Sequence, residues 1–151
     1  MAHLERALIL LALGAASSAA AGPLTVTDAW IRATPPGART AAAYLTIANA
    51  GAADRLVGGT TSVARTLEIH THLDERGLQR MVRLAELSLP AGETVRLAPG
   101  GLHLMLLDVS APLAAGASVT VSLHFAAAGT LEIEVPVVDA RAPSPTTHPA
   151  H

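Results

Sequence analysis

Apolar and polar positions alternate with a period of two along short segments of this chain, and no long stretch after residue 22 keeps the 3.6-residue period of a helix. Aliphatic and β-branched runs are separated by turn residues, chiefly Gly, Pro, Asp and Asn. The pattern predicts strands at residues 24–32, 41–48, 55–60, 66–72, 78–84, 94–97, 103–109, 118–125 and 130–138. Short strands at this spacing are typical of an all-β fold, an antiparallel β-sandwich or Greek-key barrel.

The two ends of the chain depart from this pattern. Residues 1–21 carry Arg6, an apolar run at 7–16 and a small-residue stretch at 19–21, which together predict a secretory signal peptide cleaved before Gly22. The apolar run is too short for a membrane span, so we expect export and no stable membrane insertion. Residues 22–140 form the predicted domain, and the Pro-, Ser- and Thr-rich residues 141–151 a flexible tail.

Composition narrows the possible functions. A chain of 151 residues is long enough for one domain, and its few aromatic residues predict a core of aliphatic side chains. The net charge is -2 and the arginines are spread singly, which argues against a nucleic-acid partner. Cysteine is absent, which excludes disulfides, zinc–thiolate sites, a blue-copper centre and lipid attachment at a cysteine. No nucleophile elbow, HExxH or phosphate loop occurs, so we expect no enzyme.

Two methionines lie near histidines in the predicted strands. If residues 74–77 form the loop of a hairpin, His70 stands opposite Met81, with both side chains on one face. Alternation along residues 103–109 places His103 and Met105 on one face of a second strand. If that strand lies across from the hairpin, the four side chains form a set of two nitrogens and two sulfurs (N2S2) around one ion.

The thioether sulfurs decide which metal such a set would hold. Sulfur of this kind is soft and uncharged, so it contributes little for zinc, calcium or magnesium and suits Cu(I). A methionine on a strand is also a common core filler, and a histidine is commonly a surface residue. From geometry alone, a soft-metal site and this ordinary structural role therefore both remain open.

The spacing of the four residues resembles a known family signature. Ten residues separate His70 from Met81, twenty-one separate Met81 from His103, and one separates His103 from Met105. This is similar to the H(M)-x10-M-x21-H-x-M motif of the periplasmic Cu(I) chaperones called the PCuAC family. The likeness covers about residues 25–138 and includes the segments DAW at 28–30, RATPPG at 32–37, AYL at 43–45, LPAG at 89–92 and PGGLH at 99–103.

The resemblance implies a cupredoxin-like β-sandwich that carries Cu(I) in the periplasm. It also implies delivery to the Cu-A centre of cytochrome c oxidase, with subunit II and a Sco-type protein as partners. The family often has a Met directly after the first His, where this chain has Thr71 followed by His72, so His72 is a possible additional ligand. A periplasmic copper storage or resistance protein without a dedicated recipient is the alternative.

The remaining histidines are weaker candidates for copper ligands. His124 lies on the polar face of residues 118–125 and is expected to be an ordinary exposed residue. His148 and His151 end the predicted tail, and imidazole suits Cu(II) better than thioether does, so the tail is a possible Cu(II) site. An incidental pair of histidines on a solvated terminus is the alternative for the tail.

Overall fold

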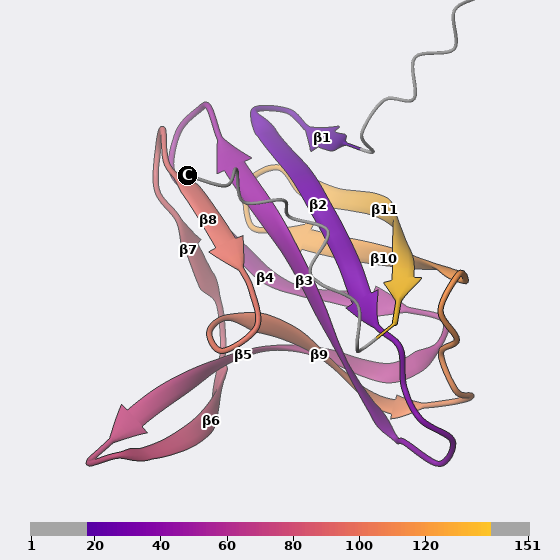
Figure 1. Ribbon diagram of the computed structural model, residues 1–151. Coiled ribbons are helices and arrows are strands. Elements are labelled where there is room, and N and C mark those ends of the chain that lie inside the picture. Colours follow the sequence, from indigo (N-terminus) through magenta and orange to yellow (C-terminus); the bar gives the residue numbers. More distant parts are fainter. Residues whose placement is uncertain (1–17, 140–151) are drawn as a thin grey trace, which may run out of the picture.

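The computed structural model describes residues 18–139, and all its regular elements are strands (Figure 1). The expectation of an all-β fold is confirmed. The strands are β1 (Ala19–Ala21), β2 (Leu24–Arg32), β3 (Thr40–Asn49), β4 (Asp54–Thr61), β5 (Ala64–Glu75), β6 (Leu78–Leu84), β7 (Leu87–Leu89), β8 (Thr94–Leu97), β9 (His103–Val109), β10 (Ser118–Phe125) and β11 (Gly129–Val138).

The main sheet closes on itself. Its strands follow the order β2-β11-β10-β4-β5-β9-β3, and β3 pairs again with β2. These pairs are antiparallel except β2 and β11, which run parallel. Strands β1, β6, β7 and β8 are attached at the margins of this closed sheet. Closure leaves the seven central strands without an unpaired edge, so each has a core face and an outer face.

The core consists almost entirely of aliphatic side chains, as the composition predicts. Leu24, Ile47, Leu56, Leu106 and Leu123 are fully buried within a single apolar cluster. Phe125 belongs to this cluster, whereas Trp30 and Tyr44 are buried without joining it. The alternation of buried and exposed positions is clearest in β11, whose odd-numbered residues from Leu131 to Val137 face the core.

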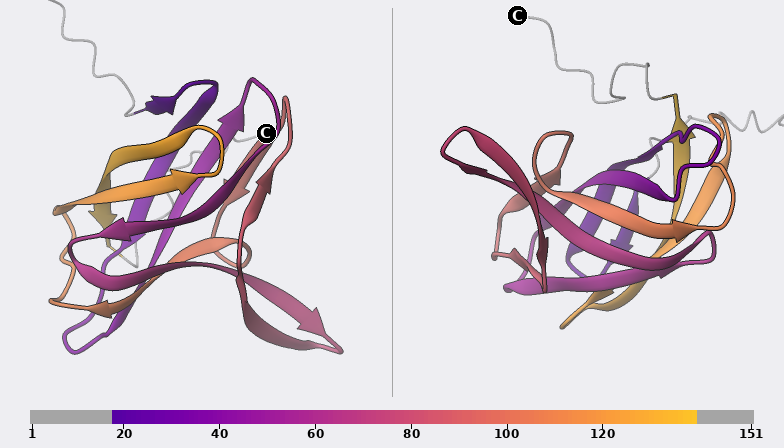
Figure 2. Two further views of the ribbon diagram at one scale, coloured as in Figure 1. Left: turned by 180° about the vertical axis from the view of Figure 1, so that it is seen from behind. Right: turned by 90° about the horizontal axis from the view of Figure 1, so that it is seen from below.

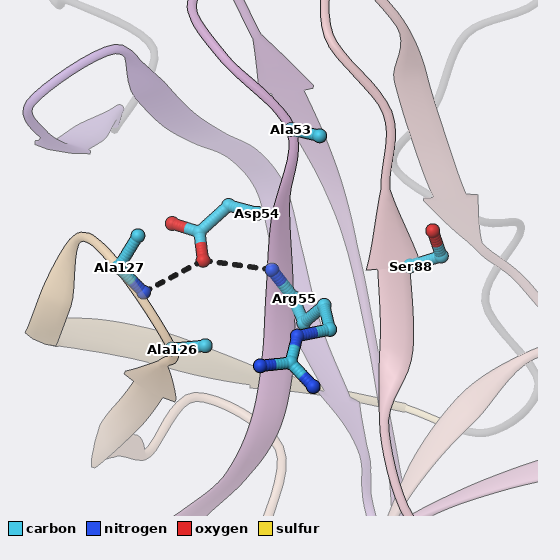
Figure 3. A pocket seen from close by; sticks show the side chains of 6 residues that line it. All are labelled: Ala53, Asp54, Arg55, Ser88, Ala126 and Ala127. Carbon is cyan, nitrogen blue, oxygen red and sulfur yellow. Dashed lines mark hydrogen bonds between the residues drawn. The ribbon is translucent and has the colours of Figure 1, made fainter.

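A buried carboxylate fixes one end of β4. Both oxygens of Asp54 accept hydrogen bonds from backbone N–H groups, with Arg55 and Ala127 on Oδ1 at 2.7 and 2.8 Å and Ala128 on Oδ2 at 2.9 Å. Figure 3 shows this carboxylate in a hollow of the surface. Burial alone would raise the pKa of Asp54, but the three hydrogen bonds lower it below its ordinary value. Asp54 thus attaches β4 to the β10–β11 loop.

The hairpin of β5 and β6 extends away from the body of the closed sheet (Figure 2). Strand β6 pairs only with β5 among the described strands, so its other edge has no partner strand there. The hairpin carries Leu73, Leu78 and Met81, which are large apolar side chains with 43%, 75% and 46% of their surface exposed. This arm is therefore the most solvent-accessible apolar part of the sheet.

The predicted signal peptide lies mostly outside the described residues. Its last part, Ala19–Ala21, forms β1 and pairs antiparallel with Leu24–Val26. Cleavage before Gly22 would therefore remove β1 from the folded domain. Within residues 18–139, no helix has the length and apolar character needed to cross a membrane.

Candidate metal centre

The register of the β5–β6 hairpin differs from the sequence prediction. The turn contains only Arg76 and Gly77, both with positive φ (56° and 81°), so His72 rather than His70 stands opposite Met81. His70 stands opposite Arg83. Two-residue turns with positive φ at both positions match the twist of hairpin strands, and the Gly77 N–H donates to Asp74 Oδ1 at 3.0 Å.

The shift amounts to two residues, so it preserves the face on which each side chain lies. His70 and Met81 still share one face, now as diagonal neighbours, and His72 joins them. The other neighbour of β5 is β9, where His103 stands directly opposite His70 and Met105 opposite Glu68. The adjacent strands β6, β5 and β9 therefore bring all four predicted ligands, together with His72, to one face of the sheet.

The histidine rings on this face lie close together. The ring centroid of His103 is 5.8 Å from that of His70 and 5.3 Å from that of His72. His103 is buried, and its Nδ1–H donates to the Gly101 carbonyl at 3.1 Å, which leaves Nε2 as the atom with a free lone pair. Burial lowers the pKa of His103, the hydrogen bond to Gly101 opposes this, and the nearby His72 and His70 lower it further.

The candidate ligands lie at different depths. His103 has 3% of its surface exposed and Met81 has 46%, whereas the exposure of His70, His72 and Met105 lies between these values. Solvent therefore reaches this face from the β6 side, at Met81.

Two aromatic rings and an arginine continue this face beyond β9. Tyr44 on β3 lies 6.4 Å from His103 and 4.7 Å from Trp30, measured between ring centroids. The Arg32 guanidinium lies over both rings, at 5.8 Å from Trp30 and 6.0 Å from Tyr44. A bulge in β2 at Asp28 and Ala29, with Asp28 at φ 56°, reverses the alternation so that Trp30 shares the face of Tyr44.

One unpaired atom supports the interpretation of this face as a metal centre. The Nδ1 atom of His70 is buried and has no hydrogen-bond partner among the described residues. A buried nitrogen without a partner is costly unless another group, such as a metal ion, contacts it. Within residues 18–139, no three His, Asp or Glu side chains are arranged to hold a metal by themselves. Met81 and Met105 add two thioether sulfurs to the same face.

The other predicted residues lie elsewhere. His124 is on the outer face of β10, where its Nδ1 is 3.0 Å from Thr130 Oγ1. His148 and His151 lie outside the described residues. The sequence interpretation missed Glu68, whose carboxylate contacts His70 at 2.7 Å. The spacing of two residues between Glu68 and His70 is the signal that places both on one face.

Comparison with known proteins gives consistent matches. Residues 24–137 match the family described as "Putative lipoprotein LpqE-like". The protein named "Putative lipoprotein Lxx21020" of Leifsonia xyli subsp. xyli is 37% identical over 116 residues, which is 76% of this chain and 69% of that protein.

Solved structures show the same fold. The copper-bound PCuAC domain from PmoF2 has a TM-score of 0.71 and 27% identity, covering 82% of this chain and 98% of that domain. The solution structure of CuI-DR1885 from Deinococcus radiodurans has a TM-score of 0.58 and 30% identity, covering 73% of this chain and 74% of that protein.

Proposed function

Because the chain belongs to the LpqE-like family and shares the fold of PCuAC domains, we propose that it is a copper(I) chaperone that works outside the cytoplasm. The observation that carries this proposal is the convergence of His70, Met81, His103 and Met105 on one face of β6, β5 and β9. The copper-bound PCuAC domain from PmoF2 and CuI-DR1885 both hold copper, which supports the same metal for this chain.

Each ligand has a distinct part in the proposed centre. The sulfurs of Met81 and Met105 favour Cu(I), because thioethers are soft and uncharged. His103 would bind through Nε2, since its Nδ1–H is held by Gly101. His70 supplies a second nitrogen, and His72, opposite Met81, is positioned to supply a third. No bond of a substrate is made or broken, so the protein acts as a carrier and the copper ion is its cargo.

Delivery requires that a recipient reach the ion. The exposure of Met81 makes its thioether the most accessible of the four ligands, so a recipient's ligand would replace it first. We propose the Cu-A centre in subunit II of cytochrome c oxidase as the destination, with a Sco-type protein as a further partner. Storage without a recipient is the alternative function. Deletion of the gene separates them, because impaired oxidase assembly at low copper favours delivery and copper sensitivity favours storage.

The proposed location rests on the predicted signal peptide and on the relatives of the chain. A cleaved signal peptide ending before Gly22 would export the domain to the periplasm. The lipoprotein names of the family and of the Leifsonia relative support a place in the cell envelope. Thioether ligands also suit this compartment, because they avoid the thiol oxidation that would damage a cysteine site there.

The central test is an anaerobic titration of the purified domain, residues 22–151, with Cu(I) against a chromogenic competitor. We expect one tightly bound Cu(I) per chain. A chain that fails to compete for Cu(I), or that binds zinc equally well, would refute the proposed function.

A further inference from the structure

Glu68 lies beside the proposed centre without belonging to the predicted ligand set. It precedes His70 by two residues on β5, and its Oε2 is 2.7 Å from His70 Nε2. Both side chains are largely buried, with 14% of His70 and 18% of Glu68 exposed. A carboxylate accepts hydrogen bonds, so this contact requires a proton on Nε2 of His70.

That requirement determines which nitrogen of His70 is free. With Nε2 protonated in a neutral imidazole, the lone pair available for a metal is on Nδ1. Nδ1 is the buried atom of His70 that has no partner among the described residues. In His103 the two nitrogens have the opposite roles. Its Nδ1–H donates to Gly101, and its Nε2 is the free nitrogen.

A second contact orients the Glu68 carboxylate. The Nε atom of Arg83 lies 3.6 Å from Glu68 Oε1, the oxygen that His70 does not use. Arg83 stands opposite His70 in the β5–β6 register, so the hairpin itself brings it there. Since 68% of Arg83 is exposed, this ion pair adds little stability and serves to orient the carboxylate.

We propose that Glu68 is a positioning residue of the copper centre, which holds His70 in the Nε2–H tautomer and so presents Nδ1 to Cu(I). This inference rests on the proposed function only for the identity of the metal. The hydrogen bond itself exists without copper, so it is tested on the metal-free protein.

The first experiment measures the tautomer of His70 by long-range ¹H–¹⁵N NMR on the ¹⁵N-labelled, metal-free domain. We expect the Nε2–H form in the unchanged protein and in Glu68→Gln, whose amide oxygen still accepts the hydrogen bond. In Glu68→Ala we expect a mixture of the two tautomers, because no acceptor then fixes the proton on Nε2. A His70 that stays in the Nε2–H form in Glu68→Ala would overturn the proposal.

The second experiment measures Cu(I) affinity by anaerobic competition. We expect Glu68→Ala to weaken binding about 10- to 100-fold, as is typical for a lost partner of a ligating histidine, and Glu68→Gln to weaken it less. Glu132→Ala, an exposed glutamate on β11, is the matched control and should bind as the unchanged protein does. Equal affinity in Glu68→Ala and Glu132→Ala would contradict the proposal.

These measurements separate the two proposals. If the unchanged domain fails to bind Cu(I) while the tautomer depends on Glu68, the chaperone proposal fails and Glu68 still orients His70. If Cu(I) binds tightly and neither readout depends on Glu68, the positioning role fails and the copper centre stands.

Discussion

His72 stands directly opposite Met81 across the β5–β6 hairpin, on the face that also carries His70 and His103. In an antiparallel pair, directly opposed side chains are the closest neighbours on a face. His72 is therefore closer in register to Met81 than His70 is, although His70 is the histidine whose spacing to Met81 resembles the family motif.

The first prediction concerns this pair. Replacing His72 with Ala should weaken Cu(I) binding at least about tenfold, or about 1.4 kcal/mol, because it removes a nitrogen beside both Met81 and His103. Anaerobic competition titration measures the change. His124→Ala, on the outer face of β10, is the matched histidine control and should bind Cu(I) unchanged. Equal affinities in the two variants would show that His72 is not a ligand.

The second prediction concerns the sulfurs. The double variant Met81→Leu with Met105→Leu should lose high-affinity Cu(I) binding while its circular dichroism and thermal midpoint stay close to those of the unchanged protein. Leucine keeps the apolar volume and removes the soft donor. Leu73→Ala, an exposed change on the opposite face of the same hairpin, is the control. Tight Cu(I) binding by the double variant would remove the methionines from the ligand set.

The third prediction concerns pH. Imidazole binds copper when neutral, so Cu(I) affinity should decline as pH falls below about 6.5. Burial lowers the pKa of His103, so this ligand stays neutral to lower pH than an ordinary histidine. The thioethers do not titrate, and some binding should persist at pH 5. Competition titrations between pH 8 and 5 measure this, and a constant affinity would argue against histidine ligands.

The same shift affects folding. Because the pKa of His103 is lower in the folded protein, the unfolded chain binds more protons as pH falls below about 6.5. The free energy of unfolding should therefore decrease in this range for the metal-free protein. Urea denaturation at pH 7.5 and 5.5 measures the loss, and His103→Asn should reduce it. A pH dependence identical in His103→Asn would assign the loss to other groups.

The fourth prediction concerns Asp54. Replacing it with Ala leaves three backbone N–H groups without their acceptor and should cost about 1–3 kcal/mol in the free energy of unfolding. Its pKa is lowered in the folded protein, so its contribution is full above about pH 4 and is lost as pH falls further. Arg39→Ala removes an exposed ion pair with Asp108 and should change stability little. Similar losses in both variants would contradict the role of Asp54.

The fifth prediction concerns the histidines outside the described residues. If His148 and His151 hold Cu(II), deleting residues 141–151 should abolish binding of a second copper equivalent when the domain is titrated with Cu(II). Isothermal titration of residues 22–151 and of residues 22–140 measures how many Cu(II) ions each binds. Unchanged Cu(II) binding would show that the tail has no role.

Most of the sheet follows from local alternation. The predicted ranges for β2, β6, β8, β9 and β10 coincide with the observed strands. β7 is not predicted because its three residues are too few to show a period, and the residues of β1 are assigned to the predicted signal peptide. Their pairing partners, β2 and β4, supply the hydrogen bonds that make them strands.

The candidate site was predicted as a set of residues on one face, but its register was not. A turn with Arg76 at a positive φ lacks the Asn-Gly or Asp-Gly pair by which such turns are recognised, so a longer loop was expected. The pairing of β5 with β9, and hence of His70 with His103, is a long-range contact that local periodicity does not encode.

The bulge at Asp28 and Ala29 divides β2 into two halves that are out of phase. Before it, even-numbered Leu24 and Val26 point into the core, and after it the odd-numbered Ile31 does. The number of residues at this point therefore decides which side chains of the second half face the core. Losing one of the two bulge residues would leave a regular strand with Ile31 still facing the core, whereas losing both would turn Ile31 outward and Trp30 and Arg32 into the apolar interior. Natural variation in this segment should consequently tolerate the loss of one residue and exclude the loss of two.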